Sequence, residues 1–201
     1  MNKQPEITSA TKQKIIDAFL SLYKVKHIEK ISIKEVTDLA GYNRGTFYVY
    51  FKDIYDLLEK IELSVLPSEE ELGRLFDQTK KKPDASFPTL SVLNEAYSRN
   101  EKYYIVLLGE NSNQHFYYKL KRVIKKALCS YLKANDSYND SVETDYIIEY
   151  IVTALIGTSN YWLREKKQIS FEELSGIQLK ILTTSPQQLL FSQKEPQNNE
   201  T

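Results

Sequence analysis

The strongest constraint on the fold is a series of helix-start and helix-stop signals within the first 60 residues. Ser32 followed three residues later by Glu35 is a capping box, in which each side chain accepts the other residue's backbone N–H. Gly41 can end that helix because glycine adopts a positive φ without steric cost. Asn43 and Asp53 can each cap a further helix, since their side chains accept backbone N–H bonds. Short helices separated by tight turns are therefore predicted.

Apolar spacing places a longer helix before this series. Residues 12–26 carry apolar side chains at helical spacing, which marks one buried face: Ile15, Phe19, Leu22 and Tyr23. His27 follows where a helix can end in the left-handed region, and we expect that conformation there.

The two short helices that follow have the spacing of a helix-turn-helix. The first should bury Val36, Leu39 and Ala40. Residues 47–51 have strand propensity, but the flanking caps and the i, i+4 pairing of Phe47 with Phe51 favour a helix.

The rest of the chain also shows helical periodicity, and six Gly and six Pro in 201 residues argue against a β-sandwich. The predicted fold is all-α, with a three-helix helix-turn-helix domain (the head) over residues 8–54 and a larger helical domain (the body) over residues 55–185. Residues 186–201 are rich in Gln and Asn, and we expect them to be disordered. The helical segments of the larger domain are residues 53–66, 68–80, 87–98, 101–108, 112–133, 144–164 and 171–182.

Charge and residue chemistry narrow the function. Residues 1–52 carry nine Lys and Arg and five Asp and Glu, a net charge of +4, and the remainder carries −4. A basic head on an acidic body is expected when one end approaches phosphates. With two His, one Cys (Cys129) and no nucleophile or phosphate-loop motif, we expect no enzyme activity, metal or cofactor. The N-terminus is polar, and the longest apolar run, residues 103–108, is far shorter than a membrane span requires. Both features indicate a cytoplasmic protein without a membrane span.

The stretch from Ile33 to Phe51, IKEVTDLAGYNRGTFYVYF, resembles the helix-turn-helix of TetR-family transcriptional regulators. The clustered Gly-Thr-Phe-Tyr-x-Tyr-Phe matches the family signature, and the resemblance covers about residues 11–60. The segments 107–109 and 161–163 resemble a subtype that includes a co-activator of a dihydroxyacetone-kinase operon. The chain departs from the family pattern at Thr37, at Tyr42-Asn43, and at Ile54, where the family has a phosphate-contacting lysine.

Recognition of DNA would use the outward face of the third helix. Phe47 and Phe51 face inward, so Arg44 can enter the major groove and pair with guanine O6 and N7. The nearby hydroxyl and lysine side chains would contact phosphates. Such contacts fix the position of the protein along the duplex without reading its sequence. Arg44 and Lys34 could instead be solvated surface charges, and Tyr48 a half-buried core residue. The predicted DNA-contacting residues are Lys34, Asn43, Arg44, Gly45, Thr46, Tyr48, Tyr50 and Lys52.

The resemblance implies a homodimer on a pseudo-palindromic double-stranded operator, with helices 144–164 and 171–182 pairing between copies. Predicted interface residues are Ile147, Ile151, Ala154, Leu155, Gly157 and Trp162, which could alternatively pack within one chain. Aromatic side chains with polar tips suit a small organic effector, although they could equally be core: Tyr97, Tyr103, Tyr104, Phe116, Tyr117 and Tyr150. The function predicted is a repressor released by a small molecule. The alternative is a regulator whose C-terminal domain binds a protein.

Overall fold

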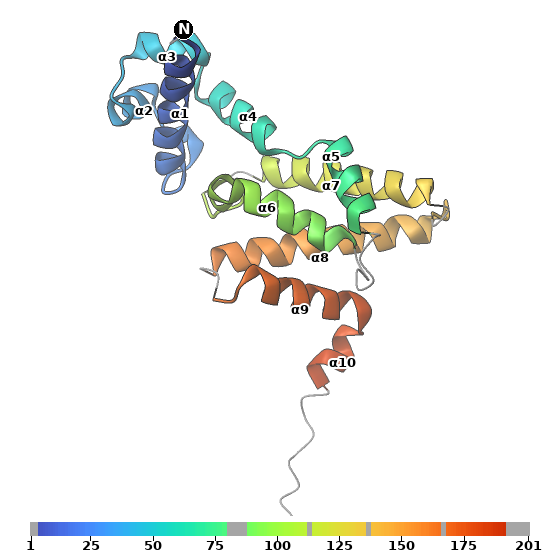
Figure 1. The fold of residues 1–201 in the computed structure, drawn as a ribbon. Helices are drawn as coiled ribbons and strands as arrows, with labels where there is room; N and C mark the ends of the chain where they lie inside the picture. The colour runs from blue at the N-terminus through green and yellow to red at the C-terminus, as the bar shows by residue number, and fades with distance from the viewer. Residues whose placement is uncertain (1–3, 80–87, 112–113, 136–137, 166–167, 192–201) are drawn as a thin grey trace, which may run out of the picture. The chain divides into compact units, whose positions relative to one another are not determined.

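The computed structural model describes residues 4–79, 88–111, 114–135, 138–165 and 168–191. Every regular element in those ranges is a helix, which confirms the all-α prediction (Figure 1). No helix among them is long and apolar enough to cross a membrane.

The head is built as the capping signals predict. Helix α1 (Gln4–Tyr23) is followed by a 3-10 turn, η1 (Ile28–Lys30), and then by α2 (Ile33–Ala40), α3 (Arg44–Tyr50) and α4 (Ile54–Val65). The core of the head is formed by fully buried side chains from four of these helices, including Phe19, Val36, Phe47 and Leu57. Residues 47–50 of the segment with strand propensity are helical in α3, which Asn43 caps and in which Phe47 is buried, and Phe51 is the extended C-cap.

Two local predictions in the head are wrong. Helix α1 ends at Tyr23, and His27 has φ −62° and ψ 148°, so it starts η1 in an extended conformation instead of ending a helix. Leu39 is 57% exposed, whereas Thr37 is only 1% exposed. On so short a helix the buried face is fixed by contact with α1, which rotates Thr37 inward and Leu39 outward.

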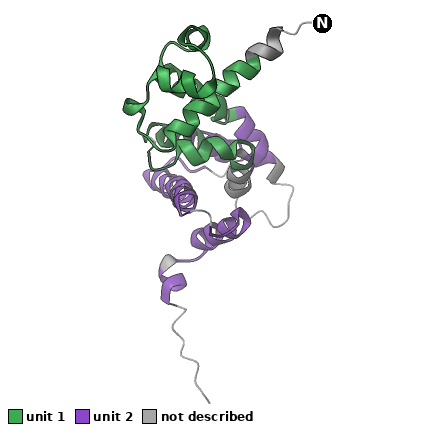
Figure 2. Ribbon diagram, turned by 90° about the vertical axis from the view of Figure 1, so that its left-hand side faces the viewer, with its two compact units in different colours: residues 1–69, 96–124 green, residues 70–95, 125–201 purple. Residues whose placement is uncertain are grey.

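The chain divides into two compact units, each containing segments distant in sequence (Figure 2). The first comprises residues 1–69 and 96–124, and the second residues 70–95 and 125–201. Helices α6 (Pro88–Leu107) and α7 (His115–Ala134) each contribute to both units. The non-helical Asn100, with φ −126°, interrupts α6 at the break that the sequence predicts between its two halves.

The second unit contains α5 (Glu69–Thr79), the long α8 (Val142–Arg164), α9 (Phe171–Thr183) and α10 (Pro186–Phe191). Gln178 is buried between α8 and α9, and its Nε2 donates to Leu155 O at 3.1 Å and Thr158 Oγ1 at 2.8 Å. Residues 186–191 form a helix where we expected disorder, with Leu189 N–H donating to Ser185 O. The rest of the expected disordered tail, residues 192–201, lies outside the described residues.

Candidate nucleic-acid interface

The start of α2 is held by the predicted capping box. Ser32 Oγ accepts from Glu35 N–H at 3.2 Å, and Glu35 Oε2 accepts from Ser32 N–H at 3.0 Å. Lys26 Nζ donates to Glu35 Oε1 at 2.6 Å. These bonds stabilise the charged carboxylate, and the one from Lys26, the largest contribution, helps to lower the pKa of Glu35 from 4.5 to about 2. The first turn of α2 is thus fixed to the segment that follows α1.

The turn between α2 and α3 has the hydrogen bonds of a Schellman motif. Gly41 adopts φ 76°, its N–H donates to Asp38 O at 3.3 Å, and Tyr42 N–H donates to Thr37 O at 2.9 Å. Asn43 Oδ1 then accepts from Thr46 N–H at 2.9 Å and starts α3. The backbone groups at the end of α2 and at the start of α3 thus have hydrogen-bond partners within the turn itself. These local bonds determine the direction of α3 relative to α2.

Gly45 has a role in this cap that the sequence does not reveal. A Cβ placed on residue 45 would lie 3.1 Å from Asn43 Oδ1, closer than an ordinary van der Waals contact. A larger residue would press on the oxygen that caps α3. The absence of a side chain at Gly45 therefore protects the N-cap in addition to thinning the helix surface.

Helix α3 is anchored by Phe47 and by Phe51 at its C-cap, which are buried at 0% and 1% exposure with ring centroids 5.5 Å apart. Tyr48 is 57% exposed, which excludes the half-buried core position considered for it. Of the other predicted DNA-contacting residues, Lys34, Asn43, Arg44, Gly45 and Lys52 are exposed and Thr46 and Tyr50 are half-buried, so the structure leaves all eight accessible.

The C-terminal end of α3 is tied to α4. Lys60 Nζ donates to Tyr50 O and to Asp56 Oδ2, both at 2.9 Å. Asp56 Oδ2 also accepts from Lys52 N–H, and this bond is the main reason that the pKa of Asp56 is lowered. Ile54 is buried at 6% exposure, so the position where the family has a phosphate-contacting lysine belongs to the core here.

The predicted effector residues differ in burial and in the compact unit to which they belong. Tyr104 packs between Tyr97 and Phe116, with centroids 6.3 Å and 5.6 Å away, and its hydroxyl donates to Val65 O. These three side chains are buried in the first unit. Tyr103 and Tyr117 are half-buried, whereas Tyr150 belongs to the second unit and is 53% exposed.

The predicted interface residues fall into two sets. Leu155 and Trp162 are buried within the chain, at 1% and 6% exposure, which favours the alternative that these two residues pack within one chain. Ile147 is 50% exposed and Gly157 is exposed, while Ile151 and Ala154 are half-buried.

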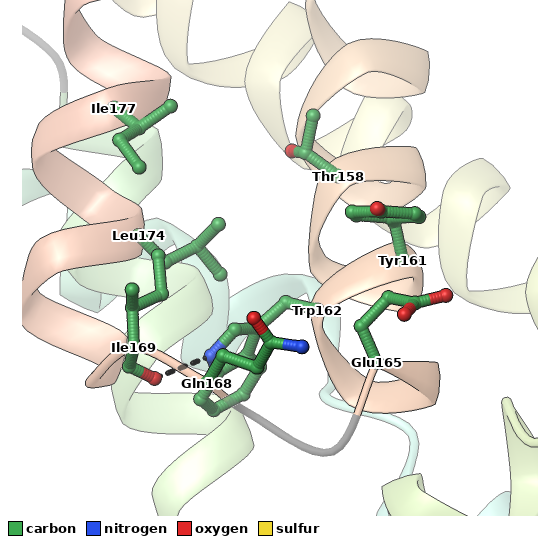
Figure 3. Close-up of a pocket in the computed structure, with 8 residues that line it drawn as sticks. All are labelled: Thr158, Tyr161, Trp162, Glu165, Gln168, Ile169, Leu174 and Ile177. Atoms are coloured by element: carbon green, nitrogen blue, oxygen red, sulfur yellow. Dashed lines mark hydrogen bonds between the residues drawn. The ribbon is translucent and has the colours of Figure 1, made fainter.

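A pocket of about 270 Å³ lies between the C-terminal part of α8 and the start of α9 (Figure 3). Its wall is mainly apolar, and Trp162 Nε1 donates to Ile169 O at 2.7 Å beside it. Sequence reasoning missed this pocket because its wall combines residues from both helices and the connection, and only Trp162 was singled out. The lining residues are Thr158, Tyr161, Trp162, Glu165, Gln168, Ile169, Leu174 and Ile177.

Comparison of the chain with known protein families identifies the class of protein to which it belongs. Residues 84–184 match a TetR-type family model described as "Transcriptional regulator C-terminal region". The chain belongs to the TetR family of transcriptional regulators. The family implies that DNA is bound through the helix-turn-helix.

Two relatives of this TetR-family chain are uncharacterized HTH-type transcriptional regulators of Bacillus subtilis (strain 168). YxbF is 27% identical over an alignment of 169 residues that covers 79% of this chain and 41% of YxbF. YvdT is 23% identical over an alignment of 193 residues that covers 87% of this chain and 91% of YvdT. The chain thus spans less than half of YxbF and most of YvdT.

Solved structures share the TetR fold. The regulator FadR from Bacillus subtilis, in complex with stearoyl-CoA, has a TM-score of 0.58 at 18% identity, covering 86% of this chain and 97% of that one. The dihydroxyacetone kinase operon activator DhaS has a TM-score of 0.52 at 20% identity, covering 86% and 93%. At these identities the likeness concerns the fold alone, and DhaS is a structural neighbour.

Proposed function

We propose that this chain is a homodimeric repressor that binds a pseudo-palindromic operator and is released from it by a small molecule. The observation that carries the proposal is the geometry of α3. Its Phe47 and Phe51 are buried, its N-cap and C-terminal carbonyl are fixed, and its opposite face is open. A rigid short helix presented in this way suits the major groove.

Arg44 is the residue proposed to read sequence. It is exposed in the first turn of α3, and among the described residues no ion pair is found for it. Its guanidinium can donate two parallel hydrogen bonds to guanine O6 and N7, a pairing worth about 1–3 kcal/mol of discrimination. Lys34, Lys52 and the hydroxyls of Tyr48 and Tyr50 would hold the phosphates on either side.

Dimerisation through α8 and α9 would place two heads on half-sites about 34–36 Å apart, or a multiple of that distance. Tyr146, Ile147, Tyr150 and Tyr161 expose apolar surface along α8, and Ile177 does so on α9. Neighbouring exposed apolar side chains of this kind commonly mark an interface.

The pocket between α8 and α9 is the proposed effector site. Apolar walls with one carboxylate, Glu165, suit a small apolar molecule that carries a hydrogen-bond donor. Tyr161, in the pocket wall, lies one turn from Gly157 on α8, so an effector there would act on the pairing of two copies. A coupling of about 1–3 kcal/mol between the sites would suffice to release DNA.

The test is to isolate the DNA bound by the purified full chain from fragments flanking its gene, and then to add metabolite extracts. Retardation of a two-fold symmetric fragment that is reversed by an extract supports the proposal. Retardation unaffected by any extract, together with a stoichiometric protein partner in pull-down, would instead favour the alternative in which the body binds a protein. Absence of any retarded fragment at low ionic strength contradicts both.

A further inference from the structure

The outward face of α3 contains a side chain outside the set predicted to contact DNA. Val49 is 74% exposed, although valine is an apolar residue and α3 is well packed on its other side. A helix turns by about 100° per residue, which places Gly45 and Val49 each about 160° from Phe47. They are therefore the two residues of α3 that point most directly away from the core.

This geometry has a consequence for the groove. Arg44 and Tyr50 lie towards the sides of α3, about 60° from Phe47, and would reach the bases or phosphates by their length. Gly45, about 40° from Val49 around the helix and one turn earlier, has no side chain to hold the helix away from the duplex. Val49 is then the side chain that projects from the centre of the presented face.

We infer that Val49 reads thymine through its C5-methyl group in the major groove. This inference rests on the proposed function, since it requires α3 to lie in that groove. Valine has no hydrogen-bonding group, so a base edge can interact with it favourably only through apolar surface. In the major groove the thymine methyl is the apolar group that distinguishes one base from the others.

The test uses a duplex selected by the full-length protein from a random-sequence pool. Each thymine is replaced in turn by deoxyuridine, which keeps the base pair and lacks only the C5-methyl group. Removing one buried methyl contact corresponds to about a fourfold loss of affinity. We expect this loss at one thymine in each half-site for the native protein, and no difference between thymine and uracil at that position for Val49→Ala.

The matched control is Val25→Ala. Val25 is 67% exposed in the same compact unit but lies after α1, outside the helix-turn-helix. This variant should keep the native preference for thymine. Binding with no methyl dependence at any thymine, or a dependence that persists in Val49→Ala, overturns the inference and leaves the proposed function intact. Failure to select any duplex overturns both.

Discussion

Single residues explain how the head departs from its family pattern without losing its shape. Thr37 stands where alanine is usual and is 1% exposed, but its Oγ1 donates to Lys34 O at 3.0 Å, so the buried hydroxyl is satisfied within α2. Asn43 replaces serine and caps α3 equally well. Ile54 is buried at 6% exposure where the family pattern has a lysine. The head therefore keeps its helices at all three of these substitutions.

Arg44→Ala should weaken binding to the selected operator by about 5- to 150-fold, which corresponds to the loss of a bidentate guanine contact of about 1–3 kcal/mol. It should also relax the preference at one base position in each half-site. Fluorescence anisotropy with the operator and its single-base variants measures both effects.

Arg122→Ala, which removes an exposed arginine from α7, is the control and should keep native affinity and preference. An unchanged base preference in Arg44→Ala would show that another side chain reads that base.

Among the helices, α2 depends on a charged cap. Glu35 has a pKa of about 2 in the folded chain, against 4.5 ordinarily, so its contribution to stability is present above pH 4.5 and is lost as the pH falls towards 2. Glu35→Gln keeps an acceptor for Ser32 N–H but lacks the charge. Its loss of stability relative to the native chain should therefore be largest above about pH 5 and disappear near pH 2. Thermal unfolding across this range measures the difference, and a pH-independent difference would contradict the assignment.

Helices α4 and α7 are joined in the first unit by an ion pair between a buried carboxylate and a half-buried lysine. Glu62 is 2% exposed and accepts from Lys119 Nζ at 2.8 Å, while His115 Nδ1 lies 3.5 Å away. A carboxylate that loses its partner in such a place is costly, because it stays out of water.

Lys119→Met should lower the free energy of unfolding by about 3 kcal/mol, the lower end of the range for a broken buried pair, because His115 remains near Glu62. The double variant Glu62→Leu with Lys119→Met removes both charges and should recover most of the loss. Denaturant unfolding of the native chain and both variants gives the values. Equal instability of the single and double variants would show that packing, and not the ion pair, dominates.

For the whole molecule, a substitution at Gly157 can test the proposed dimer separately from the folding of the single chain. A Cβ added to this exposed residue meets no atom within 4 Å, so a side chain fits within the chain. Gly157→Glu should leave the chain folded, yet prevent dimer formation by placing a carboxylate on the apolar face of α8. Sedimentation should show a monomer, and operator affinity should fall because two half-sites are no longer bound together.

Gly73→Glu is the matched control, since a Cβ on Gly73 in α5 also meets no atom within 4 Å. It should remain a dimer. A dimeric Gly157→Glu would place the interface elsewhere.

The helical architecture and the helix-turn-helix could be predicted from local sequence signals alone. Caps, turns and apolar periodicity act over three to eight residues, so Ser32, Gly41 and Asn43 specify local structure without distant partners. Which side of a short helix is buried, and which residues share a site, depends instead on packing between elements that are distant in the sequence. Because α2 packs against α1, Thr37 is buried and Leu39 is exposed, the reverse of the burial predicted for Leu39. Leu155 and Trp162 are buried within the chain. The pocket between α8 and α9 exists because residues from two helices and their connection meet in space, and burial of that kind depends on the whole packed unit.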